Sequence, residues 1–295
     1  MARVHRPTAA LGQHLTQLYD RFPFDRSLAQ DPLECVRPYL ADPRAAEIAG
    51  IFAATLAIGN TTAIRGAFVE LVRRTGPDLP GFVDATTQKN FARRLNGFRH
   101  RWIRGDQLGY LALRLSEVYA THDSLESVFL EGYTPNARFA EGLDRLAGAL
   151  RGPGSSRGPA PPPGYAALFP TPLGPSHSAC KRLTLYVRWM VRARFPDLGI
   201  WTRVPTGELR VPLDQHVFWI AYHTGLTQRR ARNWAAVEEV TEALRRIDPI
   251  DPVKYDFVLC HTGISGDCPK ERDLSVCGPC SLRPDCLLWR GVRGA

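Results

Sequence analysis

The stretch CPKERDLSVCGPCSLRPDC, residues 268–286, holds four of the seven cysteines of the chain. Eight residues separate Cys268 from Cys277, two separate Cys277 from Cys280, and five separate Cys280 from Cys286. Soft thiolate ligands select zinc or an iron–sulfur cluster. A zinc ribbon presents two pairs of closely spaced cysteines, and this stretch has one such pair. The spacing therefore favours a [4Fe–4S] cluster, with zinc as the alternative.

Composition indicates a basic, soluble protein. The chain has 295 residues, and Lys and Arg exceed Asp and Glu by nine. This excess favours a polyanionic partner, because each Lys or Arg on a phosphate releases a counterion; it also fits a basic surface without a partner. The sequence has no run of about 18 apolar residues, so it predicts no membrane span. No apolar segment follows the basic start, so we expect no secretory signal. Clustered cysteines indicate a reducing compartment, so we expect a cytoplasmic protein.

Helical periodicity dominates the chain and strand-like alternation is scarce, which predicts an all-α fold. Asp42 and Pro43 form a helix start, with Asp as the N-cap and Pro at the first helical position. We expect a buried helix over 45–58, closed by Gly59 and Asn60. Residues 151–164 are rich in Pro, Gly and Ser and predict an exposed loop. Further helices are expected over 88–103, 108–120, 136–150, 181–194, 211–226, 229–247 and 251–261.

The cysteine stretch resembles the cluster loop of the helix-hairpin-helix DNA glycosylase superfamily, which includes endonuclease III and the MutY-type adenine glycosylases. The last two spacings agree with the family, while the first gap is two residues longer here. The resemblance implies a two-lobed, all-α architecture in a divergent bacterial branch. It also implies a chiefly structural [4Fe–4S] cluster held by Cys268, Cys277, Cys280 and Cys286.

The stretch VPLDQHVFWIAYHTGL, residues 211–226, is similar to the family segment that carries the catalytic aspartate. The match assigns that role to Asp214, although Gln215 and Trp219 replace the usual threonine and arginine. Loss of a base leaves positive charge on the sugar, which a nearby carboxylate stabilises most in the transition state. The same carboxylate can activate water or an amine. The alternative is that Asp214 only caps a helix.

The segment PLGPSHSACKR, residues 172–182, takes the place of the family's DNA-binding hairpin. The resemblance makes Lys181 the candidate Schiff-base nucleophile, with a pKa lowered by burial and the neighbouring Arg182. Alternatively, Lys181 contacts phosphate or is solvated. The family glutamine that fills the gap of a flipped base is absent, so Asn60 would replace it or cap the preceding helix. Candidate DNA contacts are Gly174, Ser176, Arg182, Lys270 and Arg272.

The expected organisation has three parts. Residues 1–43 would pack with the C-terminal lobe, 44–195 would form a helical barrel with the hairpin, and 196–295 would form the C-terminal lobe with the cluster loop. The resemblance implies a monomeric DNA glycosylase of base excision repair, associated with the nucleoid, that flips and excises a damaged base from double-stranded DNA. AP lyase activity through Lys181 is left open. The alternative is a non-catalytic protein that binds DNA lesions or structures, with a structural cluster.

Overall fold

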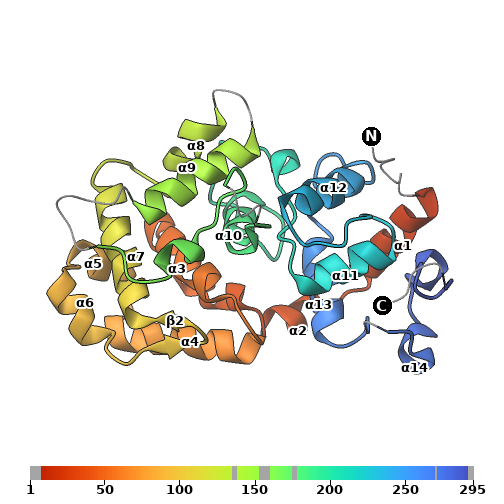
Figure 1. Cartoon of the computed structure of the whole chain (residues 1–295), viewed down its shortest axis with the longest axis horizontal. Coiled ribbons are helices and arrows are strands. Elements are labelled where there is room, and N and C mark those ends of the chain that lie inside the picture. Colours follow the sequence, from red (N-terminus) through yellow and green to blue (C-terminus); the bar gives the residue numbers. More distant parts are fainter. Residues whose placement is uncertain (1–7, 135–137, 153–159, 175–177, 270, 292–295) are drawn as a thin grey trace. The chain divides into compact units, whose positions relative to one another are not determined.

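The computed structural model describes residues 8–134, 138–152, 160–174, 178–269 and 271–291. Helices make up nearly all of the regular structure in these ranges (Figure 1). The strands found there are a single antiparallel pair of two residues each. The predicted all-α class is therefore confirmed. None of the described helices has both the length and the apolar character needed to cross a membrane.

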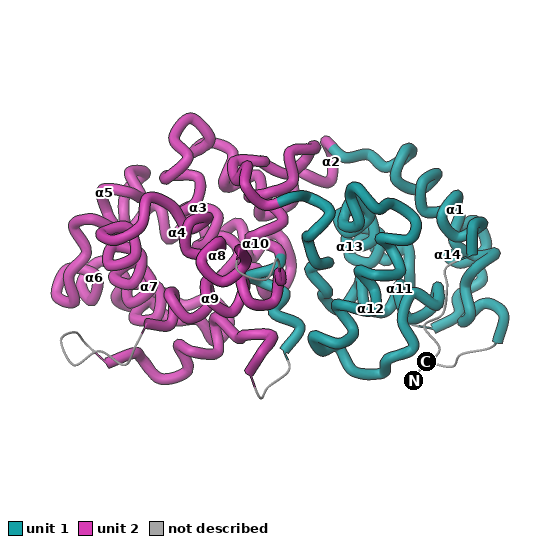
Figure 2. Tube along the Cα trace, turned by 90° about the horizontal axis from the view of Figure 1, so that it is seen from above, with its two compact units in different colours: residues 1–24, 177–184, 205–295 teal, residues 25–176, 185–204 magenta. Residues whose placement is uncertain are grey.

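The chain divides into two compact units, each built from more than one segment (Figure 2). Unit 1 comprises residues 1–24, 177–184 and 205–295, and unit 2 comprises 25–176 and 185–204. The sequence placed the first boundary at 43/44, whereas the units divide at 24/25. The reason is that two 3-10 helices, η1 (Pro32–Cys35) and η2 (Arg37–Tyr39), pack on helices of unit 2. Leu33 and Val36 are completely buried there.

Unit 2 contains the longest helices of the chain, and η1 and η2 precede them. Its remaining elements are α2 (Phe24–Leu28, with Phe24 in unit 1), α3 (Pro43–Leu56), α4 (Thr61–Thr75), α5 (Leu79–Asp84), α6 (Gln88–Arg94), β1 (Arg99–His100), β2 (Ile103–Arg104), α7 (Gly105–Tyr119), α8 (Leu125–Tyr133), α9 (Phe139–Arg151) and η3 (Tyr165–Leu168). Helix α10 (Lys181–Val191) has its first four residues in unit 1 and the rest in unit 2.

Helix α3 forms the centre of unit 2, as its apolar sequence predicts. Asp42 caps it by accepting a hydrogen bond from the Arg44 backbone N–H, and every residue from Ala45 to Leu56 is buried. Gly50 allows a close approach of α10, because a Cβ there would lie 2.6 Å from Met190 Cε. The predicted helix start is confirmed, while the helix ends two residues earlier than expected.

One buried carboxylate ties four segments of unit 2 together. Glu47, on α3, accepts hydrogen bonds from Trp201 Nε1 at 2.5 Å and from the Tyr119 hydroxyl at 2.8 Å. The backbone N–H groups of Leu125 and Glu126 at the start of α8 donate to the same carboxylate. Burial raises the pKa of Glu47. The four donors provide the partners that a buried carboxylate needs.

A second buried carboxylate, Asp197, pairs with two arginines: Arg188 of α10 and Arg192, which follows the helix directly. Arg188 donates from Nε at 3.1 Å and Nη2 at 3.0 Å to one oxygen, and Arg192 Nη1 donates at 3.0 Å to the other. All three side chains are at most 3% exposed. This ion cluster joins α10 to the segment that follows it, within unit 2.

The predicted helix over 88–103 is wrong in its second half. Helix α6 ends at Arg94, and Gly97 follows with a φ of 72°. The chain then turns back through β1 and β2, with Arg101 in the turn at a φ of 56°. The aromatic residues at helical spacing suggested one helix, but the left-handed glycine ends it.

Unit 1 combines an N-terminal helix with the C-terminal third of the chain. Its elements, besides the start of α10, are α1 (Ala9–Asp20), η4 (Thr206–Glu208), α11 (Gln215–His223), α12 (Trp234–Arg245), α13 (Asp256–Ile264), α14 (Leu274–Cys277) and η5 (Arg283–Asp285). The expected start of the last long helix at Asp251 is wrong, because residues 252–255 form a turn and α13 begins at Asp256. The expected cap Thr227 is likewise replaced by Asn233, which accepts from Ala236 N–H.

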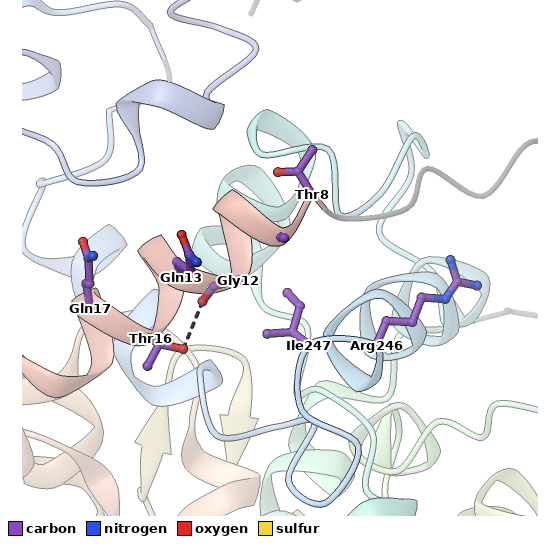
Figure 3. Close-up of a pocket in the computed structure, with 8 residues that line it drawn as sticks. Thr8, Gly12, Gln13, Thr16, Gln17, Arg246 and Ile247 are labelled. Atoms are coloured by element: carbon purple, nitrogen blue, oxygen red, sulfur yellow. Dashed lines mark hydrogen bonds between the residues drawn. The ribbon is translucent and has the colours of Figure 1, made fainter.

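Helix α1 is tied to both the C-terminal helices and the cysteine stretch. Thr16 Oγ1 lies 3.0 Å from the Tyr255 hydroxyl, and His14 Nδ1 lies 2.6 Å from Asp285 Oδ2. An open groove of about 640 Å³ lies between α1 and the end of α12, and Gly12 and Ile247 are among the residues that line it (Figure 3). None of the predicted site residues lines this groove.

Candidate functional site

Asp214 is held at the start of α11 by both of its carboxylate oxygens. Oδ1 accepts a hydrogen bond from the Val217 backbone N–H at 2.8 Å, which makes Asp214 the N-cap of α11. Oδ2 accepts from the Cys260 thiol, with 3.0 Å between oxygen and sulfur. The side chain is half-buried. The capping role is therefore confirmed, and it fixes a carboxylate at a helix N-terminus, where its negative charge is favoured.

Cys260 is the neighbour of Asp214 that the sequence analysis missed. It lies on α13, which packs against α11. The approach is close, because a Cβ on Gly263 of α13 would lie 2.4 Å from the Cβ of His216. Burial raises the pKa of the Cys260 thiol well above its usual value, and the negative charges of Asp214 and Asp256 raise it further. The thiol is therefore a hydrogen-bond donor at neutral pH.

Lys181 is brought into the same part of unit 1. It is the half-buried first residue of α10, and its positive charge acts on the Cys260 thiol by lowering the pKa that burial raises. The residue before it, Cys180, has a left-handed backbone with a φ of 51°. Next to it, burial lowers the pKa of Arg182 to about 10. Lys181 is thus near enough to Cys260, the partner of Asp214, for its charge to act on the thiol.

A helix-hairpin-helix motif consists of two α-helices joined by a tight turn. In the described residues 160–174 of this segment, the element before the turn is a 3-10 helix, η3, and not an α-helix. Gly174 lies in a bend and donates its N–H to the Thr171 carbonyl at 3.4 Å. Ser176 lies outside the described residues. After them, Ser178 forms an isolated backbone bridge with Asn233.

The four clustered cysteines line one small cavity of about 30 Å³ in unit 1. Cys277 is the last residue of α14, whose N-cap is Asp273, and Cys286 follows directly after η5. The loop is joined to α11 by a hydrogen bond of 2.7 Å from Leu287 N–H to the His223 carbonyl. The rest of the lining includes the apolar side chains of Ile220, Leu282, Leu288 and Trp289.

The donor set of this cavity fits a thiophilic metal group. All seven cysteines lie in the described residues, and none of them is in a disulfide. Burial and the three neighbouring thiols raise the pKa of Cys268 to about 12. A cationic metal centre would reverse this effect, because it stabilises thiolates directly. Among the described residues, no three His, Cys, Asp or Glu side chains are close enough together to hold a single metal ion.

A profile of the family described as protein of unknown function (DUF2400) matches residues 31–265. The chain belongs to the DUF2400 family. No curated protein and no solved structure matches the chain. The DUF2400 match includes Lys181, Asp214 and Cys260 and ends before Cys268. The residues around Asp214 thus lie within the matched range, while the cysteine loop lies beyond it.

Two arginines surround a tryptophan in the loop beyond the DUF2400 match. The guanidinium of the exposed Arg272 lies 4.3 Å from the centre of the Trp289 ring, and that of Arg283 lies 5.4 Å from it. Because Trp289 lines the cysteine cavity, these cation–π contacts hold positive charge beside it. Lys270, the other predicted DNA contact in this loop, lies outside the described residues.

Asn60 lies in unit 2 of this DUF2400 chain and caps a helix. Its side-chain oxygen accepts a hydrogen bond from Ala63 N–H at 2.8 Å, so it is the N-cap of α4. The expected role as a cap of the preceding helix is wrong, because α3 ends at Leu56 with Ala57 as its C-cap. Its predicted role in filling the gap of a flipped base stays a prediction.

Proposed function

We propose that this chain is a DNA glycosylase that flips a damaged base out of double-stranded DNA and cleaves its N-glycosidic bond. One observation carries the proposal: a half-buried carboxylate, Asp214, is fixed at a helix N-terminus beside the thiol of Cys260, and Lys181 acts on that thiol. A carboxylate and an amine are the two groups that hydrolytic and lyase-type glycosylases need. The resemblance to the helix-hairpin-helix glycosylases and their two-lobed architecture supports the same function.

The chemistry assigns a separate part to each group. When the bond between the sugar C1′ and the base breaks, its electrons go to the base and positive charge develops on the sugar. The Asp214 carboxylate would stabilise that charge and take a proton from the attacking water, whose oxygen bonds to C1′. In the lyase version, the Lys181 amine bonds to C1′ instead as the base leaves, and Asp214 takes the proton that the amine loses. The ring C–O bond at C1′ then breaks, its electrons go to the ring oxygen, and the opened sugar is held as a Schiff base.

The second part of the proposal is a [4Fe–4S] cluster held by Cys268, Cys277, Cys280 and Cys286. The shared cavity and the soft donor set support it, and zinc is the competing metal. When bound, the cluster would stabilise the loop, which supplies positive charge from Arg272 toward phosphate. Equal amounts of iron and acid-labile sulfide, with a visible absorption band that dithionite bleaches, would identify the cluster; stoichiometric zinc would refute it.

The test of base excision uses duplexes that each carry one damaged base. We expect one class of duplex to yield an abasic site, and Asp214→Asn to abolish base release while leaving DNA affinity unchanged. Asn caps helices as well as Asp does, so the variant removes the charge and keeps the fold. Asp42→Asn is the matched control, because Asp42 caps α3 in the same way. Full activity of Asp214→Asn would refute the mechanism.

Lyase chemistry has its own assay. Borohydride should trap a covalent adduct between protein and DNA if Lys181 is the nucleophile, and the adduct should disappear in Lys181→Ala. Base release without a trapped adduct would assign the hydrolytic version, in which water attacks.

The competing function is non-catalytic binding of DNA lesions or structures by a monomer. Two observations favour it: the element before the turn at Gly174 is a 3-10 helix, and Asn60 is engaged as a helix cap. Tight lesion binding with no abasic product from any base in the screen would establish this function instead.

A further inference from the structure

Cys260 makes a long-range contact with the candidate catalytic carboxylate. Its thiol donates to Asp214 Oδ2, from a residue 46 positions further along the chain. Because Val217 N–H occupies Oδ1, each oxygen of the carboxylate has a donor. The side chain of Asp214 is thus held at two points, one on α11 and one on α13.

We infer that Cys260 is a positioning residue whose thiol fixes the orientation of the Asp214 carboxylate. This inference rests on the proposed function, because it takes Asp214 as the carboxylate that acts on the sugar. It goes beyond that function, since it assigns a role to a residue outside the carboxylate, the lysine and the cluster ligands.

A thiol can take this role because its S–H group is a hydrogen-bond donor. It donates to Oδ2, the oxygen that the Val217 N–H leaves open. With a donor on each oxygen, rotation of the carboxylate is restricted. The carboxylate can then stabilise charge on the sugar without first having to be oriented.

The surroundings of Cys260 keep its thiol protonated. Burial, Asp214 and Asp256 raise the pKa of the thiol, and only the charge of Lys181 lowers it. The close packing of Gly263 on His216 fixes the distance between α11 and α13, so the contact does not depend on a mobile loop. Cys260 therefore acts as a donor, and nucleophilic attack is left to water or Lys181.

The contact itself can be tested without any activity assay. The S–H stretching band of Cys260, isolated as the infrared difference between the native protein and Cys260→Ala, should lie at lower frequency than that of a free thiol. It should move to higher frequency in Asp214→Ala, which removes the acceptor. A band that Asp214→Ala leaves unmoved would overturn the inference.

The role of the contact is tested by single-turnover base release from the duplex that the native protein cleaves best. Cys260→Ala should slow release by about threefold to tenfold, the range for one modest hydrogen bond, with unchanged DNA affinity. Cys260→Ser retains a donor and should recover most of the rate. Cys35→Ala, which removes a half-buried cysteine of unit 2, is the control and should have no effect.

The two hypotheses fail in different ways. Equal rates for the native protein and Cys260→Ala would overturn the positioning role while leaving Asp214 as the catalytic carboxylate. Equal slowing in Cys260→Ala and Cys260→Ser would also overturn it, because packing and not the donor would then be responsible. Unchanged base release in Asp214→Asn would instead refute the proposed function.

Discussion

The ion cluster of Arg188, Arg192 and Asp197 makes the sharpest prediction about stability. Asp197→Asn removes the negative charge that lies between two arginines and leaves both positive charges buried. Each arginine donates to Asp197 at 3.0 Å, and the side chains are at most 3% exposed, so water cannot replace the lost partner. Removing one member of a buried ion pair costs about 3 to 5 kcal/mol.

This cost is large against the total stability of a folded unit, about 5 to 15 kcal/mol. For a unit of this size, 1 kcal/mol lowers the Tm by about 2 to 4 °C, so we expect Asp197→Asn to lower it by about 6 to 20 °C. Thermal unfolding followed by circular dichroism and tryptophan fluorescence measures the shift. Trp189 and Trp201 report on unit 2, since both are buried there.

The matched control is Asp84→Asn. Asp84 pairs with Arg44, but the two side chains are 53% and 34% exposed, so its loss should cost at most about 1 kcal/mol. The expected drop in Tm is then about 4 °C or less. Equal shifts for the two variants would refute the reasoning, because they would mean that burial adds nothing to the Asp197 cluster.

Four further predictions concern three positions in unit 1 and one, Gly66, in unit 2. Gly263→Ala should force α11 and α13 apart and lower the free energy of unfolding by about 1 to 3 kcal/mol, because its Cβ would lie 2.4 Å from that of His216. Gly66→Ala, where no atom lies within 4 Å, should stabilise α4 by about 0.5 to 1 kcal/mol in the same denaturation assay. Arg272→Ala should weaken binding to damaged and undamaged duplexes alike and reduce the slope of log affinity against log salt by about one; an unchanged slope in a titration would remove Arg272 from the DNA contacts. Cys277→Ser should lower the iron content of the purified protein, measured together with acid-labile sulfide, and a full complement of iron would exclude Cys277 as a ligand.

Local sequence signals predicted those parts of the fold that depend on neighbouring residues. Asp42 and Pro43 indicated the start of α3, because an N-cap and a first-turn proline act within one helical turn. The prediction of one helix over 88–103 failed at Gly97. The positive φ of this glycine interrupts the helix despite the helical spacing of the apolar residues around it. The start of α13 was placed five residues early, because Asp251 and Pro252 have the composition of a cap but lie in a turn.

The same holds for the candidate site: its local features were predicted from the sequence, and its long-range contact was not. The capping geometry of Asp214 followed from its position before an apolar helix, and the grouping of the four cysteines followed from their spacing. Cys260 could not be predicted as the partner of Asp214, since no spacing rule relates residues 46 positions apart on two packed helices. The sequence did contain a weaker signal for Cys260. It lies one helical turn after Asp256, so both polar side chains are on the same face of their helix.

The hydrogen bond between α1 and Tyr255, the residue before α13, also has a consequence for the order of events during synthesis. The hydrogen bond of Thr16 can form only after the ribosome has added Tyr255, 239 residues later. At about 5 to 20 residues per second, this delay is roughly 12 to 48 s. During that time α1, whose Leu11 and Leu15 the finished protein buries, lacks the part of unit 1 that follows in the sequence. Unit 2 has its whole sequence once residue 204 is made, so it can fold while the last segment of unit 1 is still being synthesised.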